Sequence, residues 1–66
     1  MNIILNGKSH ELTDDASVAD LIVDLNLSGK RVAVEVNKDI VRRADHAEHI
    51  LKPDDRVEVV TLVGGG

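Results

Sequence analysis

The chain has 66 residues, of which 42% are hydrophobic, and it contains neither aromatic residues nor cysteine. This length supports one small domain with one core, and the lack of thiols excludes disulfides and cysteine chemistry. Twelve acidic residues outnumber eight basic ones, giving a net charge of −4, which argues against nucleic acid or an anionic membrane as partner. No apolar run approaches the roughly 18 residues of a membrane span, so we expect a cytoplasmic protein without a leader peptide.

The first twelve residues predict a β-hairpin. Residues 1–6 are apolar at their centre, and Asn6-Gly7 favours the positive φ angles that a type I′ turn requires. Residues 8–12 are then the returning strand, in which Leu12 faces the core and His10 lies at the core edge. This hairpin is the strongest local structural signal in the sequence.

An amphipathic helix is predicted over residues 17–25. Ser17 is a suitable N-cap, and Asp20 follows three residues later in a capping-box relation. Apolar residues then recur at the spacing of one helix face. They are Val18, Leu21, Ile22 and Leu25. Residues 26–30, which include Ser28-Gly29, are expected to end the helix.

The second half of the chain predicts further strands. Alternating valines indicate a strand over residues 31–37, and Ile40-Val41 form a short strand after a turn. Residues 44–51 are ambiguous between a loop and one helical turn, and Pro53 favours a turn. Residues 56–63 are rich in β-branched side chains, as a central strand tends to be, and we expect this strand to run parallel beside the first. The fold class is therefore α+β, with a mixed sheet of four or five strands packed on one main helix.

The three last residues carry the strongest functional signal. Gly64, Gly65 and Gly66 directly follow the last predicted strand, which divides the chain into a domain over residues 1–63 and a flexible glycine tail over 64–66. Glycine makes this tail thin and conformationally free, with a reach of about 10 Å. We expect it to carry the α-carboxylate of Gly66 into the active site of another protein. Terminal glycines are also typical of disorder alone, and the tail by itself leaves both interpretations open.

Several motifs occur in a fixed order along nearly the whole chain. They are the Asn6-Gly7 hairpin, the helix over residues 17–25, VEVN at 34–37 with Ile40-Val41 and Arg42 after it, DDRVEVV at 54–60 and VGGG at 63–66. This order resembles the ubiquitin-like β-grasp fold. Within that fold it resembles the ThiS family of small sulfur carriers of thiamine biosynthesis.

The resemblance implies a protein carrier and not an enzyme, with no bound cofactor and no metal. An E1-like (ThiF-like) adenylating enzyme uses ATP to join AMP to the carboxylate of Gly66, which gives the carboxylate a good leaving group. A persulfide sulfur donor then displaces AMP, and the thiocarboxylate that results donates sulfur on a thiazole synthase (ThiG-like). Gly64 and Gly65 supply a slim approach to the nucleotide.

Strand alternation predicts a docking face on the sheet. Ile4, Val60 and Leu62 have the parity opposite to Val57 and Val59. If the latter two face the helix, the former three form an apolar patch on the outer face, where a partner enzyme would dock. The alternative that other side chains cover them locally stays open.

Other polar residues give weaker signals. His46 and His49 have the spacing of two ligands on one helix face, but without a further ligand we expect both on the solvated surface. The pairs Asp14-Asp15 and Asp54-Asp55 are expected to cap turns. Arg42-Arg43 is expected at a solvated edge, with an acidic patch of a partner as the alternative.

Three alternative functions remain open at this point. The first is a sulfur carrier for another pathway, such as one resembling MoaD of molybdopterin synthesis, or one for tRNA thiolation or cysteine synthesis. The second is a β-grasp protein-interaction module with an inert tail. The third is a protein-conjugating modifier.

Overall fold

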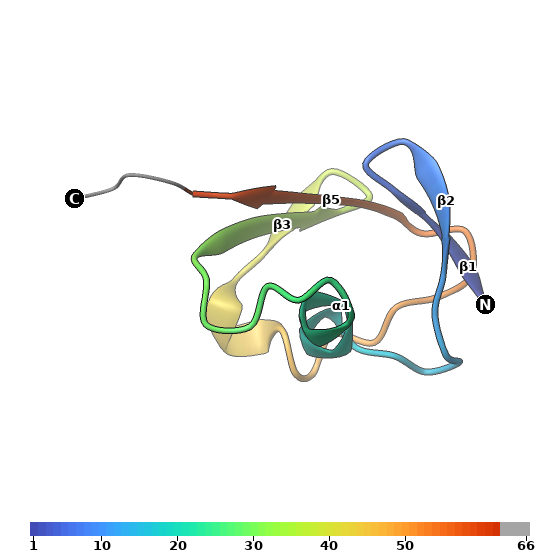
Figure 1. Cartoon of the computed structure of the whole chain (residues 1–66). Coiled ribbons are helices and arrows are strands. Elements are labelled where there is room, and N and C mark those ends of the chain that lie inside the picture. Colours follow the sequence, from blue (N-terminus) through green and yellow to red (C-terminus); the bar gives the residue numbers. More distant parts are fainter. Residues whose placement is uncertain (63–66) are drawn as a thin grey trace.

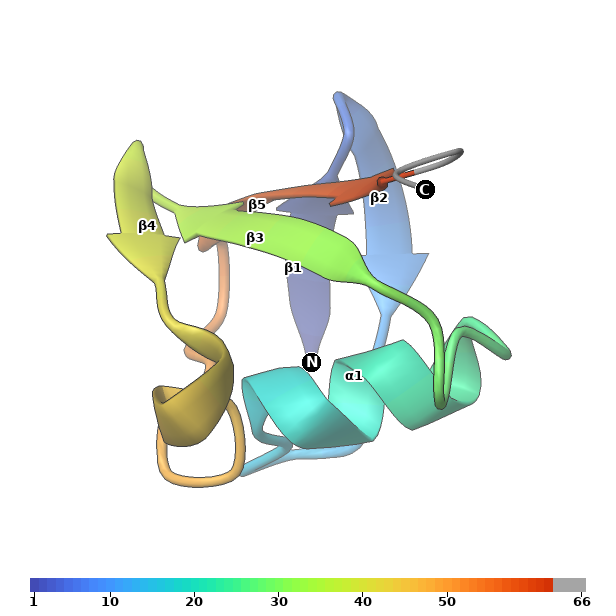
Figure 2. The same cartoon turned by 90° about the vertical axis from the view of Figure 1, so that its left-hand side faces the viewer.

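The computed structural model describes residues 1–62, which form a mixed sheet lying over one α-helix (Figure 1). The elements in chain order are β1 (Asn2–Leu5), β2 (Lys8–Glu11), α1 (Val18–Asp24), β3 (Val32–Val36), β4 (Asp39–Val41), the short 3₁₀-helix η1 (Arg43–Asp45) and β5 (Arg56–Thr61). Figure 2 shows α1 and η1 on the same side of the sheet. The predicted α+β arrangement around one main helix is confirmed.

The last strand lies at the centre of the sheet. Within residues 1–62 the sheet has five strands, in the order β2-β1-β5-β3-β4. β1 and β5 run parallel, whereas β1–β2, β3–β4 and β3–β5 are antiparallel pairs. β5 therefore joins two hairpins that do not otherwise pair with each other, and its predicted place beside β1 is confirmed.

Two tight turns close these hairpins. Asn6 and Gly7 have φ angles of 49° and 84°, the left-handed conformation predicted for this turn. Asn37 and Lys38 connect β3 to β4 with φ angles of 51° and 74°. The left-handed backbone at both turns matches the right-handed twist of the strands, so each pair of strands stays in register.

The helix begins where the sequence predicts. The Ser17 side chain accepts a hydrogen bond from the backbone N–H of Asp20 at 3.1 Å, and the Asp20 carboxylate accepts one from the Ser17 N–H at 2.9 Å. This capping box satisfies two backbone donors that the helix itself leaves free. At the other end Leu25 is the C-cap, and Asn26 has a φ of 59°, which takes the chain out of the helix.

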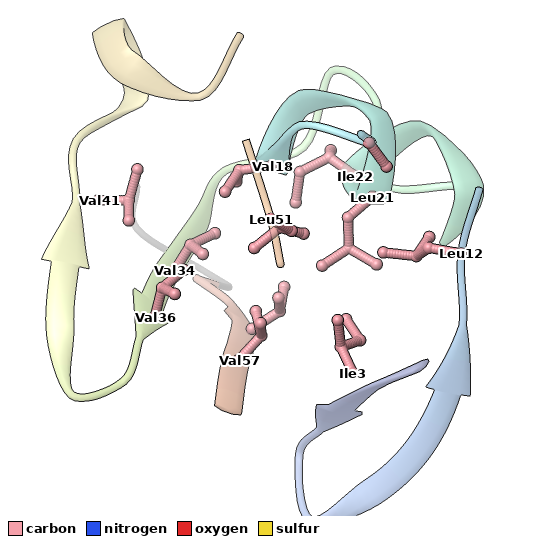
Figure 3. Close-up of a cluster of buried hydrophobic side chains, with 12 residues drawn as sticks. Ile3, Leu12, Val18, Leu21, Ile22, Val34, Val36, Val41, Leu51 and Val57 are labelled. Carbon is pink, nitrogen blue, oxygen red and sulfur yellow. The ribbon is translucent and has the colours of Figure 1, made fainter. Parts of the chain in front are cut away.

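A single aliphatic core lies between α1 and the sheet (Figure 3). Its buried members are Ile3, Leu12, Ala16, Val18, Leu21, Ile22, Val34, Val36, Val41, Leu51, Val57 and Val59. Leu25, the fourth residue of the predicted apolar stripe, is partly buried against this cluster. In Figure 3 the side chains of Leu21 and Leu51 lie near the middle of the cluster.

Residues 44–51, which the sequence left ambiguous, pack against the first turn of α1. η1 is followed by turns, and the carbonyl oxygens of His46 and His49 accept hydrogen bonds from the N–H groups of Ala19 and Val18 at 3.0 and 2.9 Å. The N–H of Leu51 in turn donates to Ala16 O at 2.8 Å. Residues 44–51 thus supply acceptors for the first turn of α1 and one buried core side chain.

Candidate functional site

The site predicted from the sequence begins where β5 leaves the sheet. Thr61, the last residue of β5, pairs with Val32 of β3. The N–H of Leu62 then donates a hydrogen bond to Arg31 O at 2.9 Å. We call Thr61, Leu62 and Arg31 the tail exit, because the chain continues from here to its three glycines. In Figure 1 the end of β5 lies on the side of the molecule opposite Met1.

The side chain of Asn6 fixes β5 shortly before the tail exit. β1 ends at Leu5, but Asn6 Oδ1 accepts a hydrogen bond from the Val59 N–H at 2.9 Å, and Asn6 Nδ2 donates to Val59 O at 3.1 Å. The backbone N–H of Asn6 also donates to Val57 O at 2.9 Å. The amide therefore continues the β1–β5 ladder by one step, and we call this pair of side-chain bonds the Asn6 brace.

The predicted reacting residue, Gly66, and the glycines of the predicted tail lie outside the described residues. Gly64, Gly65 and Gly66, together with Val63, follow Leu62 directly. The adenylation site assigned to Gly66 and the division between a domain over residues 1–63 and a tail over 64–66 stay predictions. What the structure defines is the position from which this segment departs.

Two of the three predicted docking residues lie on the outer face of the sheet. Val57 and Val59 are buried on the helix side, whereas Val60 is 54% exposed and Ile4 is half-buried. Ile4 of β1 lies beside Arg56, the first residue of β5. Val60 follows four residues later in β5 and pairs with Ala33 of β3. Glu58 stands between Ile4 and Val60 on the same face, so the apolar surface is interrupted by charge. Docking through this face stays a prediction.

Leu62 has different surroundings from Ile4 and Val60. It is 53% exposed and borders a groove that Ile22 and His46 line from the helix side of the sheet. β5 ends at Thr61, but the bond from the Leu62 N–H to Arg31 O continues the pairing with β3 by one residue. That Ile4, Val60 and Leu62 form one docking patch stays a prediction.

The prediction that both histidines are solvated is wrong for His46. This residue is only 9% exposed, and its Nε2 lies 3.1 Å from Val41 O. The burial of His46 results from contacts between distant residues, because the carbonyl oxygens of His46 and His49 bond to the first turn of α1 and hold this segment against the helix. His49 itself is half-buried. The arrangement gives His46 a structural role at the floor of the groove that borders Leu62.

The other polar candidates have structural roles. Asp54 has a φ of 69° in the predicted turn, and the Asp55 carboxylate accepts a hydrogen bond from the Lys52 N–H at 2.9 Å. His10 lies 2.9 Å from Asp24, which links β2 to the end of α1 at the core edge. In residues 1–62 no three His, Asp or Glu side chains are grouped as a metal site would require. None of the helices in this part of the chain has the length and apolarity that crossing a membrane demands.

The mixed sheet, with the last strand central and parallel to the first and one helix across one face, defines a ubiquitin-like β-grasp protein. A sequence model of the ThiS family matches residues 3–66, nearly the whole length. The chain therefore belongs to the ThiS family.

Individual relatives support this assignment. The sulfur carrier protein ThiS of Bacillus subtilis is 38% identical over 63 residues, which cover 94% of this chain and 96% of the relative. The crystal structure of the thiamine biosynthesis protein ThiS from Geobacter metallireducens superposes with a TM-score of 0.84 at 29% identity, and the match covers both chains completely.

A thiazole synthase of Magnetococcus marinus is also 38% identical, over 66 residues. All of this chain is matched, but it spans only 20% of that longer protein. A segment that resembles this chain therefore occurs within a polypeptide named for thiazole synthesis.

Proposed function

We propose that this protein is the sulfur carrier of thiamine biosynthesis and carries sulfur as a thiocarboxylate on Gly66. The observation that carries the proposal is the ThiS family match, which extends through residue 66 and so includes the three glycines. The fold is consistent with this use, because β3 holds one edge of β5 up to the tail exit, and β1 with the Asn6 brace holds the other edge as far as Val59. A rigid base below a thin segment favours entry of that segment into an enzyme.

The proposed chemistry needs activation of the carboxylate. A carboxylate oxygen is a poor leaving group, and linkage to AMP by an E1-like adenylating enzyme with ATP supplies a good one. The terminal sulfur of a persulfide can then attack the carbonyl carbon of Gly66 and release AMP, which leaves an acyl disulfide between Gly66 and the donor. A second thiol of the donor or of the partner enzyme attacks the donor's sulfur, forms a disulfide with it and releases the thiocarboxylate on Gly66. The missing Cβ atoms of Gly64 and Gly65 leave room for a close approach of the backbone to the nucleotide. ATP belongs to the partner enzyme in this scheme.

A thiazole synthase is the proposed acceptor of the sulfur. The support is the Magnetococcus marinus thiazole synthase, in which a segment similar to all 66 residues of this chain is one fifth of the polypeptide. Covalent connection of two domains raises their effective concentration for each other. Such an arrangement is expected for domains that act on one another.

The intact mass of the protein tests the proposal. The protein is incubated with ATP, the adenylating enzyme of the same organism and a persulfide donor. We expect a gain equal to the exchange of one oxygen for one sulfur, localised to Gly66, which requires a free α-carboxylate there. A variant without Gly65 and Gly66 is the matched control and should show no gain while keeping its far-UV circular dichroism. An unchanged mass with an adenylating enzyme proven active on another carrier would contradict the proposal and favour an inert tail.

A further inference from the structure

A groove of about 290 Å³ lies beside the tail exit. Its walls come from α1, from the segment that enters β3, from η1 and from the residue that follows β5. The lining residues are Ile22, Gly29, Lys30, Arg31, Val32, Arg43, His46 and Leu62. Figure 1 shows the end of β5, the start of β3 and η1 on the same side of the molecule. We call this feature the exit groove.

The charge of the exit groove is opposite to that of the protein. The whole chain has a net charge of −4, yet within the described residues the groove is lined by Lys30, Arg31 and Arg43 and by no acidic side chain. All three basic residues are exposed. The ion pairs formed within residues 1–62 join Met1 to Asp14 and His10 to Asp24, and none of them includes these three cations.

The floor of the groove is apolar and firmly held. Ile22 is 8% exposed and Val32 is partly buried against the core. The imidazole of His46 is fixed by its contact with Val41 O, and the backbone of Arg31 is tied to Leu62. The cationic side chains thus stand on a preorganised base. An apolar floor with a basic rim suits a protein segment that combines an apolar side chain with carboxylates, since guanidinium groups bind carboxylates in a bidentate manner.

We propose that the exit groove is the docking site for an acidic surface segment of the thiazole synthase. This inference rests on the proposed function, because it assigns a surface to the partner that accepts sulfur from Gly66. Leu62 is four residues from Gly66, a distance of at most about 14 Å along an extended chain. A protein that takes up the glycines must therefore lie against the surface at the tail exit, and opposite charges there speed and orient the encounter.

Two double charge reversals test the inference. Arg31→Glu with Arg43→Glu changes the exit groove, whereas Lys8→Glu with Lys52→Glu changes exposed lysines that do not line it. Both variants have the same net charge of −8, so net charge alone cannot make them differ. The dissociation constant of each for purified thiazole synthase of the same organism is measured by calorimetry, without ATP, at low and high salt. Thermal melts establish that both variants are folded.

The groove variant should bind at least about tenfold more weakly than the wild type at low salt, and the control should stay within about twofold. High salt should weaken binding of the wild type until its dissociation constant approaches that of the groove variant. Equal weakening in both variants, unchanged binding by the groove variant, or no binding of the wild type each overturns the inference. A groove variant that loses affinity for the adenylating enzyme but not for the thiazole synthase also overturns it, because the groove then serves the other enzyme. Tight binding of inorganic phosphate that only the groove variant loses also overturns it, because the groove is then a phosphate site. A failure of the proposed function is separately visible as a wild type that gains no sulfur at Gly66.

Discussion

Replacement of Asn6 by glycine tests whether the Asn6 brace holds the end of β5. Glycine keeps the left-handed backbone that Asn6 adopts at a φ of 49°, but it removes both side-chain bonds to Val59. Each lost hydrogen bond costs about 0.5–1.5 kcal/mol, so the free energy of unfolding should fall by about 1–3 kcal/mol. The added freedom of glycine in the unfolded chain contributes about 0.4–1 kcal/mol more.

Such a loss is large for this protein. Domains of this length are stable by about 3–10 kcal/mol, and each kcal/mol corresponds to a shift of roughly 4–8 °C in Tm. Because the chain has no aromatic residues, the melt is followed by far-UV circular dichroism and not by fluorescence. Hydrogen exchange supplies the local measurement, since the Val59 N–H donates to Asn6 and should lose its protection.

Lys38→Gly is the matched control for the effect of glycine itself. Lys38 also has a left-handed φ, of 74°, but its exposed side chain forms no hydrogen bond within residues 1–62. Relief of that backbone strain should leave the control as stable as the wild type or more stable. If Asn6→Gly melts as high as the wild type, or keeps the protection of the Val59 amide, the reasoning about the brace is refuted.

Three further substitutions probe other parts of the structure. Ser17→Ala removes the N-cap of α1 and should lower stability by about 1 kcal/mol, whereas Ser17→Asp should restore it; equal melting of the two would show that the capping box contributes nothing. Leu21→Ala truncates a fully buried core side chain and should lower the free energy of unfolding, measured in urea, by about 2–5 kcal/mol. A decrease below about 1 kcal/mol would contradict this. Val60→Lys changes an exposed side chain and should alter stability by no more than about 0.5 kcal/mol while slowing thiocarboxylate formation; an unchanged rate would remove Val60 from the docking surface.

Local rules explain which parts of the fold could be predicted from the sequence. The Asn6-Gly7 turn and the capping box of Ser17 and Asp20 depend on residues at most three apart, so the sequence displays them directly. The central position of β5 could be predicted because its β-branched composition is typical of a strand buried between neighbours.

The parts that could not be predicted depend on contacts between distant residues. The Asn6 brace joins positions 53 residues apart. Nothing in the turn sequence indicates that the Asn6 side chain will bond to the backbone of β5 as a further strand residue would. The burial of His46 follows from the packing of its backbone on α1. The exit groove combines Arg31, which precedes β3, with Arg43, which follows β4. Only the folded chain shows that both line the same groove as Leu62.

The order of the strands has a consequence for biosynthesis. Among the described elements β5 is synthesised after the other four strands, although it is the element that joins the β1–β2 hairpin to the β3–β4 hairpin. An isolated two-stranded hairpin is at best marginally stable in water. A polypeptide that stops before Arg56 therefore lacks the strand that pairs with both β1 and β3, and should not assemble this sheet. The fold thus makes assembly of the sheet depend on the same strand that leads to the glycines.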